Sequence, residues 1–99
     1  MQSKKIKVVS LYIKEGKLSR ETEKALIFNS RLGHKGIFIV PKSQIHEFKK
    51  VVTWFETWKG RISCRAYKLV VPLWWVQKHD SNIRRLGNDI KVINNHKYD

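Results

Sequence analysis

The chain contains a single cysteine, Cys64, and this scarcity excludes two kinds of stabilising framework. No intramolecular disulfide can form, and metal sites built from paired C-x-x-C units need more thiols than the chain has. The four histidines, His34, His46, His79 and His96, do not show metal-ligand spacing. We therefore expect no metal and no cofactor, and a reducing compartment suits the composition best.

Long apolar runs are also missing. No segment approaches the ~20 apolar residues that a membrane-spanning helix needs. The N-terminal residues 1–5 include two lysines but are not followed by an apolar run of signal-peptide length. The sequence therefore predicts a cytoplasmic protein without a membrane partner.

Acidic residues are few: 8 Asp and Glu face 21 Lys and Arg in 99 residues, a formal net charge of +13. The basic residues are spread from Lys4 to Lys97 rather than gathered in a tail. Self-repulsion of such a charge opposes the compact state unless a polyanion neutralises it. The charge therefore indicates nucleic acid as the first class of partner to consider.

What the chain does have is apolar and aromatic residues in short, β-favouring runs. The hydrophobic fraction is 41%, with four Trp, four Phe and three Tyr, which is enough for one modest core. We predict a mainly β domain, a small antiparallel barrel or curved sheet of the oligonucleotide-binding or SH3-like kind, with one or two short helical turns. The expected strands are residues 6–13, 24–29, 36–40, 51–58 and 61–71.

Two prolines mark expected boundaries. Pro41 ends a strand, after which Ser43 is expected to cap a short helical turn carrying Ile45 and Phe48. Pro72 closes the long strand and opens a helical turn that reaches Lys78.

The domain is expected to span residues 1–79. Residues 80–99 read as a polar C-terminal extension with mobile last residues and a possible edge strand at 90–93.

The adjacent Trp74 and Trp75 cannot share one helical face. One is therefore expected to pack in the core and the other to stay near the surface, and packing is favoured over binding for both. The exposed indole could still stack on a base or anchor a protein interface.

The hairpin at residues 51–71 carries the most informative pattern. If Lys59-Gly60 is a two-residue loop, Trp58 lies opposite Arg61, Trp54 opposite Arg65, and Val52 opposite Tyr67, all on one face. The other face receives the core-like set of Thr53, Phe55, Thr57, Ile62, Cys64 and Ala66. Aromatic and basic side chains therefore share the outer face.

Flat rings beside guanidinium groups suit single-stranded nucleic acid, because rings stack on bases and cations neutralise phosphates. The predicted binding residues are Trp54, Trp58, Lys59, Arg61, Arg65 and Tyr67, with Lys35 and Lys42 extending the positive surface. Two other interpretations stay open. The Trp and Arg side chains could pair with each other as internal cation–π contacts, or a one-residue register slip could turn the indoles inward.

Catalysis is a minority interpretation. Cys64 falls on the inward side of the predicted hairpin, where a small packing role is favoured over a nucleophile. The pair His79-Asp80 keeps a metal-dependent nuclease as a third alternative, although such an enzyme usually gathers several carboxylates around its metal.

One pattern resembles short β-rich proteins of phages and other mobile elements. It runs from Lys24 through Pro41-Lys42-Ser43-Gln44-Ile45 to Pro72-Leu73-Trp74, about half of the chain. The resemblance implies a bacterial mobile-element setting and a compact sheet, and no particular activity.

Together these patterns predict a protein that binds nucleic acid with little sequence preference, with single-stranded DNA favoured over RNA or duplex. The alternative is a small mobile-element protein that binds an acidic protein partner, such as a nucleic-acid enzyme, through Trp74 or Trp75 and steering charges around it.

Overall fold

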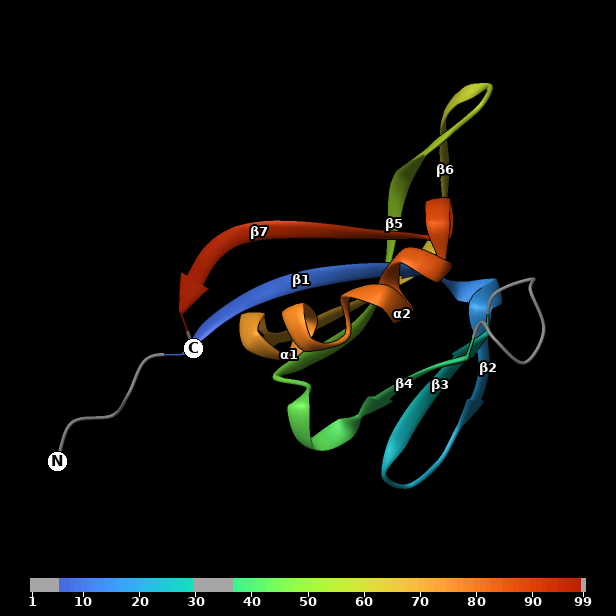
Figure 1. The fold of residues 1–99 in the computed structure, drawn as a ribbon. Helices are drawn as coiled ribbons and strands as arrows, with labels where there is room; N and C mark the ends of the chain where they lie inside the picture. Colours follow the sequence, from blue (N-terminus) through green and yellow to red (C-terminus); the bar gives the residue numbers. More distant parts are fainter. Residues whose placement is uncertain (1–5, 30–36, 99) are drawn as a thin grey trace, which may run out of the picture.

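The computed structural model describes residues 6–29 and 37–98 and shows a mainly β fold, which confirms the predicted class. Two antiparallel sheets and two short helices make up this part of the chain (Figure 1). The elements are β1 (Lys7–Lys14), η1 (Glu15–Lys17), β2 (Leu18–Glu21), β3 (Ala25–Asn29), β4 (Ile37–Pro41), η3 (Lys42–Gln44), β5 (Glu47–Thr57), β6 (Gly60–Pro72), α1 (Leu73–Lys78), α2 (Asp80–Arg85), η4 (Gly87–Asp89) and β7 (Ile90–Tyr98).

The larger sheet has the strand order β5-β6-β1-β7. β1 pairs with β6 from Val8 opposite Pro72 to Lys14 opposite Ala66, and β5 continues beside β6 beyond that point. The β5–β6 hairpin therefore projects from the body as a two-stranded ribbon (Figure 1). We call residues 52–65 the arm.

The smaller sheet has the order β2-β3-β4. The expected pairing of the second and third apolar runs is confirmed, with Leu26 opposite Val40 and Phe28 opposite Phe38. β2 was not expected, because Leu18 is its one apolar residue and gives no alternating pattern. β2 forms because its backbone can pair with the free edge of β3, whose own residues are mostly apolar and favour a strand.

The core lies between the two sheets and the helices. Phe28 is fully buried, with its ring centroid 6.4 Å from that of Phe38 and 6.3 Å from that of Tyr67. β1 and β6 contribute a second group of fully buried aliphatic side chains, Leu11, Ile13, Leu69 and Val71. Burial of these large side chains drives the folding of the domain.

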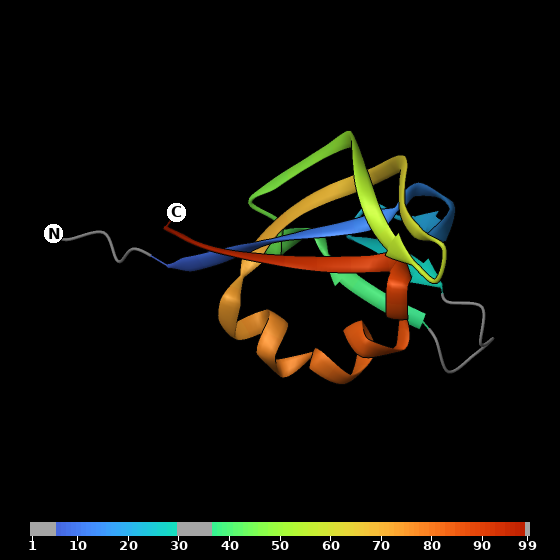
Figure 2. The ribbon, with the colours of Figure 1, turned by 90° about the horizontal axis from the view of Figure 1, so that it is seen from above.

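The helices cover one side of the larger sheet (Figure 2). The helix that Pro72 was expected to open runs over Leu73–Lys78, as predicted. Trp75 is buried, and its ring centroid lies 5.6 Å from that of Phe38, whereas Trp74 is exposed. The expected division between the two indoles is confirmed.

The boundary expected after residue 79 is not a structural boundary. Ile83, Leu86 and Ile90 belong to the core, and β7 pairs with β1 along Ile90–Tyr98. The strand expected at 90–93 is therefore present at the edge of the sheet and longer than predicted. The polar composition misled the prediction because three apolar side chains suffice to attach this segment.

The turn after Pro41 also differs from expectation. It is the 3-10 turn η3, and Ser43 lies inside it and makes no capping hydrogen bond. Phe48 was expected on this turn but lies in β5, which begins at Glu47. Two exposed lysines at 49 and 50 had hidden the strand pattern.

Candidate nucleic-acid interface

In the arm the strand side chains lie on the predicted faces, but the residues that lie opposite each other on β5 and β6 differ from the prediction. Trp54 lies opposite Ser63, Val52 opposite Arg65, and Glu56 opposite Arg61. Each partner is two residues away from the predicted one. A shift of two leaves the side chains of both strands on their predicted faces, because side chains alternate with a period of two.

The turn explains the shift. Thr57 pairs with Gly60, so Trp58-Lys59 is the loop rather than Lys59-Gly60. The Thr57 hydroxyl accepts a hydrogen bond from the Lys59 N–H at 3.2 Å and donates one to the Gly60 carbonyl at 2.7 Å. Gly60 has a φ of +107°, a value that glycine adopts easily. This preference favours the position of Gly60 directly after the loop. This threonine contact is the signal that sequence reasoning missed.

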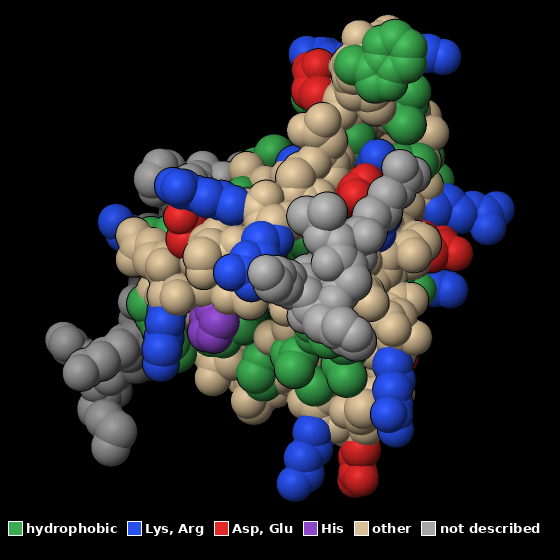
Figure 3. Space-filling model, turned by 45° about the vertical axis from the view of Figure 1, so that its right-hand side comes forward, with side chains coloured by type: hydrophobic (Ala, Val, Ile, Leu, Met, Phe, Trp, Pro, Cys, Tyr) green, Lys and Arg blue, Asp and Glu red, His purple; other side chains and the backbone are tan. Residues whose placement is uncertain are grey.

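Trp58 stands at the tip of the arm with 88% of its surface exposed. The Lys59 ammonium lies 4.8 Å from its ring centroid. Figure 3 shows a large hydrophobic side chain at this tip with basic side chains on either side. An exposed indole beside cations is the arrangement that base stacking and phosphate neutralisation require.

Trp54 is 43% exposed, but cations already contact its ring. Arg61 Cζ lies 4.0 Å and Lys91 Nζ 4.1 Å from the ring centroid. The internal cation–π interpretation therefore describes Trp54, with Arg61 and Lys91 in place of the expected Arg65. Arg61 also forms an ion pair with Glu56 at 3.1 Å.

Lys91 was not recognised from sequence. It extends from β7 and donates hydrogen bonds to the Trp54 carbonyl at 2.6 Å and to the Thr53 hydroxyl at 2.9 Å. Partial burial, followed by repulsion from Arg61, lowers the pKa of its ammonium below 10.5. Lys91 thus holds β7 against β5, and no local pattern could reveal a contact across 37 residues.

The prediction that Tyr67 belongs to the binding site is wrong. It lies on the predicted face, but at 7% exposure it is part of the core. Its ring stacks on Phe48 with centroids 5.3 Å apart and planes 18° apart. Phe48 remains exposed, so it takes the place of Tyr67 as the aromatic side chain at this end of the face. The reason is that β6 enters the core at Ala66.

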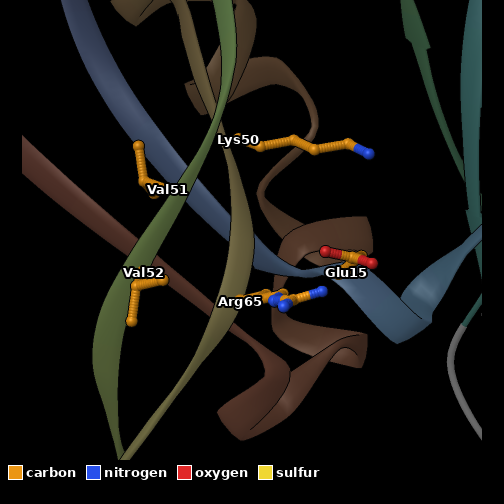
Figure 4. A pocket seen from close by; sticks show the side chains of 5 residues that line it. All are labelled: Glu15, Lys50, Val51, Val52 and Arg65. Atoms are coloured by element: carbon orange, nitrogen blue, oxygen red, sulfur yellow. The ribbon is translucent and has the colours of Figure 1, made fainter.

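A shallow pocket of about 270 Å³ lies where the arm meets the body. Lys50, Val51, Val52 and Arg65 line it from the hairpin, and Glu15 lines it from η1. In Figure 4 the side chains of Lys50 and Arg65 extend to the same side, toward Glu15. Two exposed cations therefore continue the positive face from the arm to the body.

The two outlying lysines of the predicted site do not join the arm. Lys42 lies in η3 and forms an ion pair with Glu21 at 2.7 Å. Figure 1 places η3 at the opposite end of the molecule from the tip of the arm. Lys35 lies outside the described residues.

The side chains that could suggest catalysis have other contacts. The His79 ring stacks on Trp75 at 4.4 Å between centroids, and its Nδ1 lies 2.9 Å from the Trp75 carbonyl oxygen. Asp80 pairs with Arg84 at 2.8 Å. Cys64 is half-buried in β6. Within residues 6–29 and 37–98 there is no group of three or more His, Cys, Asp or Glu that could hold a metal ion.

No helix in the described part of the chain has the length and apolar character to cross a membrane. Comparison of the chain with protein-family models, curated proteins and solved structures found no match. The functional argument therefore rests on the geometry of the arm and its surroundings.

Proposed function

We propose that the protein binds nucleic acid through the arm, with single strands favoured over closed duplex and little sequence preference. The observation that carries this proposal is the exposed indole of Trp58 at the apex of a basic ribbon. Its ring can stack on an unpaired base, and stacking tolerates every base because each has a π face.

The phosphate contacts come from side chains along the ribbon. Lys59 and Arg61 lie at the tip, and Arg65 and Lys50 follow toward the body, all of them exposed. Phe48 and Trp54 are six residue steps apart in β5, about 20 Å at ~3.3 Å per residue. This length matches a short stretch of single strand, with Phe48 as a second aromatic contact at its far end.

Trp54 has a supporting role in this mechanism. Its ring holds Arg61 and Lys91 in place, so the guanidinium group is positioned before a phosphate arrives. Stacking of a base on Trp54 itself would have to displace a cation.

The proposal is tested by fluorescence anisotropy with a labelled thymidine oligonucleotide and a duplex of equal length, at several salt concentrations. We expect the single strand to bind more tightly and its affinity to fall steeply with salt. Trp58→Ala should weaken binding by about 1–3 kcal/mol, the usual contribution of one stacked base.

Trp74→Ala is the matched control, because Trp74 is also an exposed indole but lies on α1. It should leave the affinity unchanged. Equal losses in the two variants, or no binding of the wild type at low salt, would refute the proposal.

A further inference from the structure

The pocket where the arm meets the body contains one carboxylate beside two cations, Glu15 with Lys50 and Arg65. The strand register brings these three side chains together. The last residue of β1 lies opposite Ala66, so the residues that follow on the two antiparallel strands are Glu15 and Arg65. On β5, Val52 lies opposite Arg65, and Lys50 shares the face of Val52 because side chains alternate with a period of two. In Figure 4 the Glu15 carboxylate lies between the ends of the Lys50 and Arg65 side chains.

The carboxylate in this pocket is not neutralised by the lysines next to it in the sequence. Lys14 and Lys17 both pair with Asp89, at 3.1 Å and 3.3 Å. Within residues 6–29 and 37–98, neither Glu15 nor Arg65 forms an ion pair or a side-chain hydrogen bond. A hydrogen-bond acceptor and a donor in the same pocket are therefore both available to a ligand.

A phosphate alone does not match this lining, because the carboxylate repels it. A carboxylate accepts hydrogen bonds and donates none, so the part of a ligand that contacts it must carry N–H or O–H groups. The two cations need the opposite, an acceptor or a negative charge. The edge of a nucleobase carries donors and acceptors side by side. The volume of about 270 Å³ lies just below the ~300–1,000 Å³ of sites that hold whole small molecules, so it suits a single base.

The four bases differ in how well their edges match a carboxylate beside a cation. Guanine presents two adjacent donors, N1–H and N2–H, and its O6 acceptor lies next to them. Cytosine and adenine each present one exocyclic amine to the carboxylate. Thymine has a single N–H between two carbonyl oxygens, and the carboxylate repels both oxygens. Guanine is therefore the base that satisfies the most groups of this pocket.

We infer that the pocket takes the base of one guanine in the bound strand. Its N1–H and N2–H donate to Glu15, and its O6 accepts from Lys50 or Arg65. The cation that does not contact O6 stays available for the adjacent phosphate. Phe48 lies on the same face of β5, two residues from Lys50, so its exposed ring can stack on the neighbouring base. The inference rests on the proposed function and adds one selective position to a surface that otherwise tolerates any sequence.

The test compares a short thymidine oligonucleotide with the same strand carrying one central guanine. Both compete against a labelled thymidine strand in fluorescence anisotropy. We expect the guanine strand to bind about fivefold more tightly, at the low end of the discrimination that one bidentate contact gives. A strand with inosine at the same position lacks the N2 amine and should bind with intermediate affinity. This arm of the experiment tests the contact without changing the protein.

Glu15→Gln should abolish the preference, because the amide turns a donor toward the guanine donors. Its affinity for the thymidine strand should not fall, because the substitution removes a negative charge. Glu56→Gln is the matched control. Glu56 is an exposed carboxylate on the arm, outside the pocket, and pairs with Arg61 at 3.1 Å. It removes the same charge and should leave the ratio of the two affinities unchanged.

The inference is overturned if the wild type binds the guanine and thymidine strands equally, or if cytosine or adenine at the central position binds more tightly than guanine. It is also overturned if Glu15→Gln retains the preference. Equal binding of the two strands would leave the proposed function intact. Absence of binding to either strand at low salt would refute the proposed function itself.

Discussion

The two halves of β6 belong to one strand but have different surroundings. From Ala66 to Val70 the strand has β5 on one side and β1 on the other, β1 continues beside it to Pro72, and most of the side chains from Ala66 to Pro72 are buried. From Gly60 to Arg65 it has β5 alone, and its side chains are exposed or half-buried. β1 ends at Lys14, opposite Ala66, and beyond this point Phe55 is the one buried side chain of the arm. The free half contributes little to the core, so its two exposed arginines, Arg61 and Arg65, call for a functional explanation.

The sharpest way to test this division is to compare one aromatic residue from each region. Phe28→Ala should lower the free energy of unfolding by about 3–5 kcal/mol, because it removes a fully buried ring and leaves a cavity. Trp58→Ala should change it by less than about 0.5 kcal/mol, since the indole is at the surface. Urea denaturation measures both. A large loss in Trp58→Ala would show that the arm is part of the core.

Gly60→Ala tests the geometry of the arm itself. The φ of +107° at Gly60 is one that other residues rarely adopt, although no atom lies within 4 Å of an added Cβ. The cost is therefore in the backbone, about 1–3 kcal/mol. Gly16→Ala is the control, because Gly16 also has open space and lacks this φ. Thermal denaturation should show a lower Tm for Gly60→Ala alone.

Arg65→Ala sharpens the assignment of phosphate contacts to the arm. If Arg65 neutralises one phosphate, the slope of log affinity against log salt for a single strand should fall by about 0.7. Lys78→Ala removes an exposed charge from α1 and should leave the slope unchanged. Titrations at four or more salt concentrations give the slopes. Equal changes in both variants would mean that net charge, not the arm, determines binding.

Lys91 connects β7 to the arm through its hydrogen bonds to Thr53 and Trp54. We expect the protonation of its ammonium to make the stability of the fold slightly pH-dependent. Its pKa in the fold is lowered mainly by burial, so the unfolded chain binds the proton more tightly. Between the lowered pKa and 10.5, stability should therefore rise with pH as the buried charge is lost.

Thermal denaturation of the wild type and of Lys91→Met across this range isolates the effect. The stability of the wild type relative to the variant should increase toward alkaline pH. A constant or falling difference would mean that burial is not the main influence on this ammonium.

The sequence predicted much of the fold because most strands carry strong local signals. Runs of β-branched residues predicted the strands β1, β3, β4 and β6. Pro72 predicted the start of the helix α1. β2 was missed because its residues are mostly polar. The start of β5 was missed because Lys49 and Lys50 interrupt its pattern. These short-range signals fail where neighbouring strands, rather than the residues themselves, stabilise the extended backbone.

The candidate site was predicted in part. Trp58 and Arg65 are exposed on the arm as expected, whereas Tyr67 is buried and Lys42 lies elsewhere. Lys91 and Phe48 were absent from the prediction. Lys91 reaches Trp54 from a distant strand, and Phe48 depends on a strand start that local pattern obscured.

The sequence alone determined the charge, the β-rich class and the faces of the hairpin, because composition and a period of two are properties of the chain itself. The tertiary structure decided how far along β6 the core extends and which cations contact Trp54. These depend on where β1 ends and where β7 docks. Such long-range contacts are set by packing of the whole chain and leave no trace in any short segment.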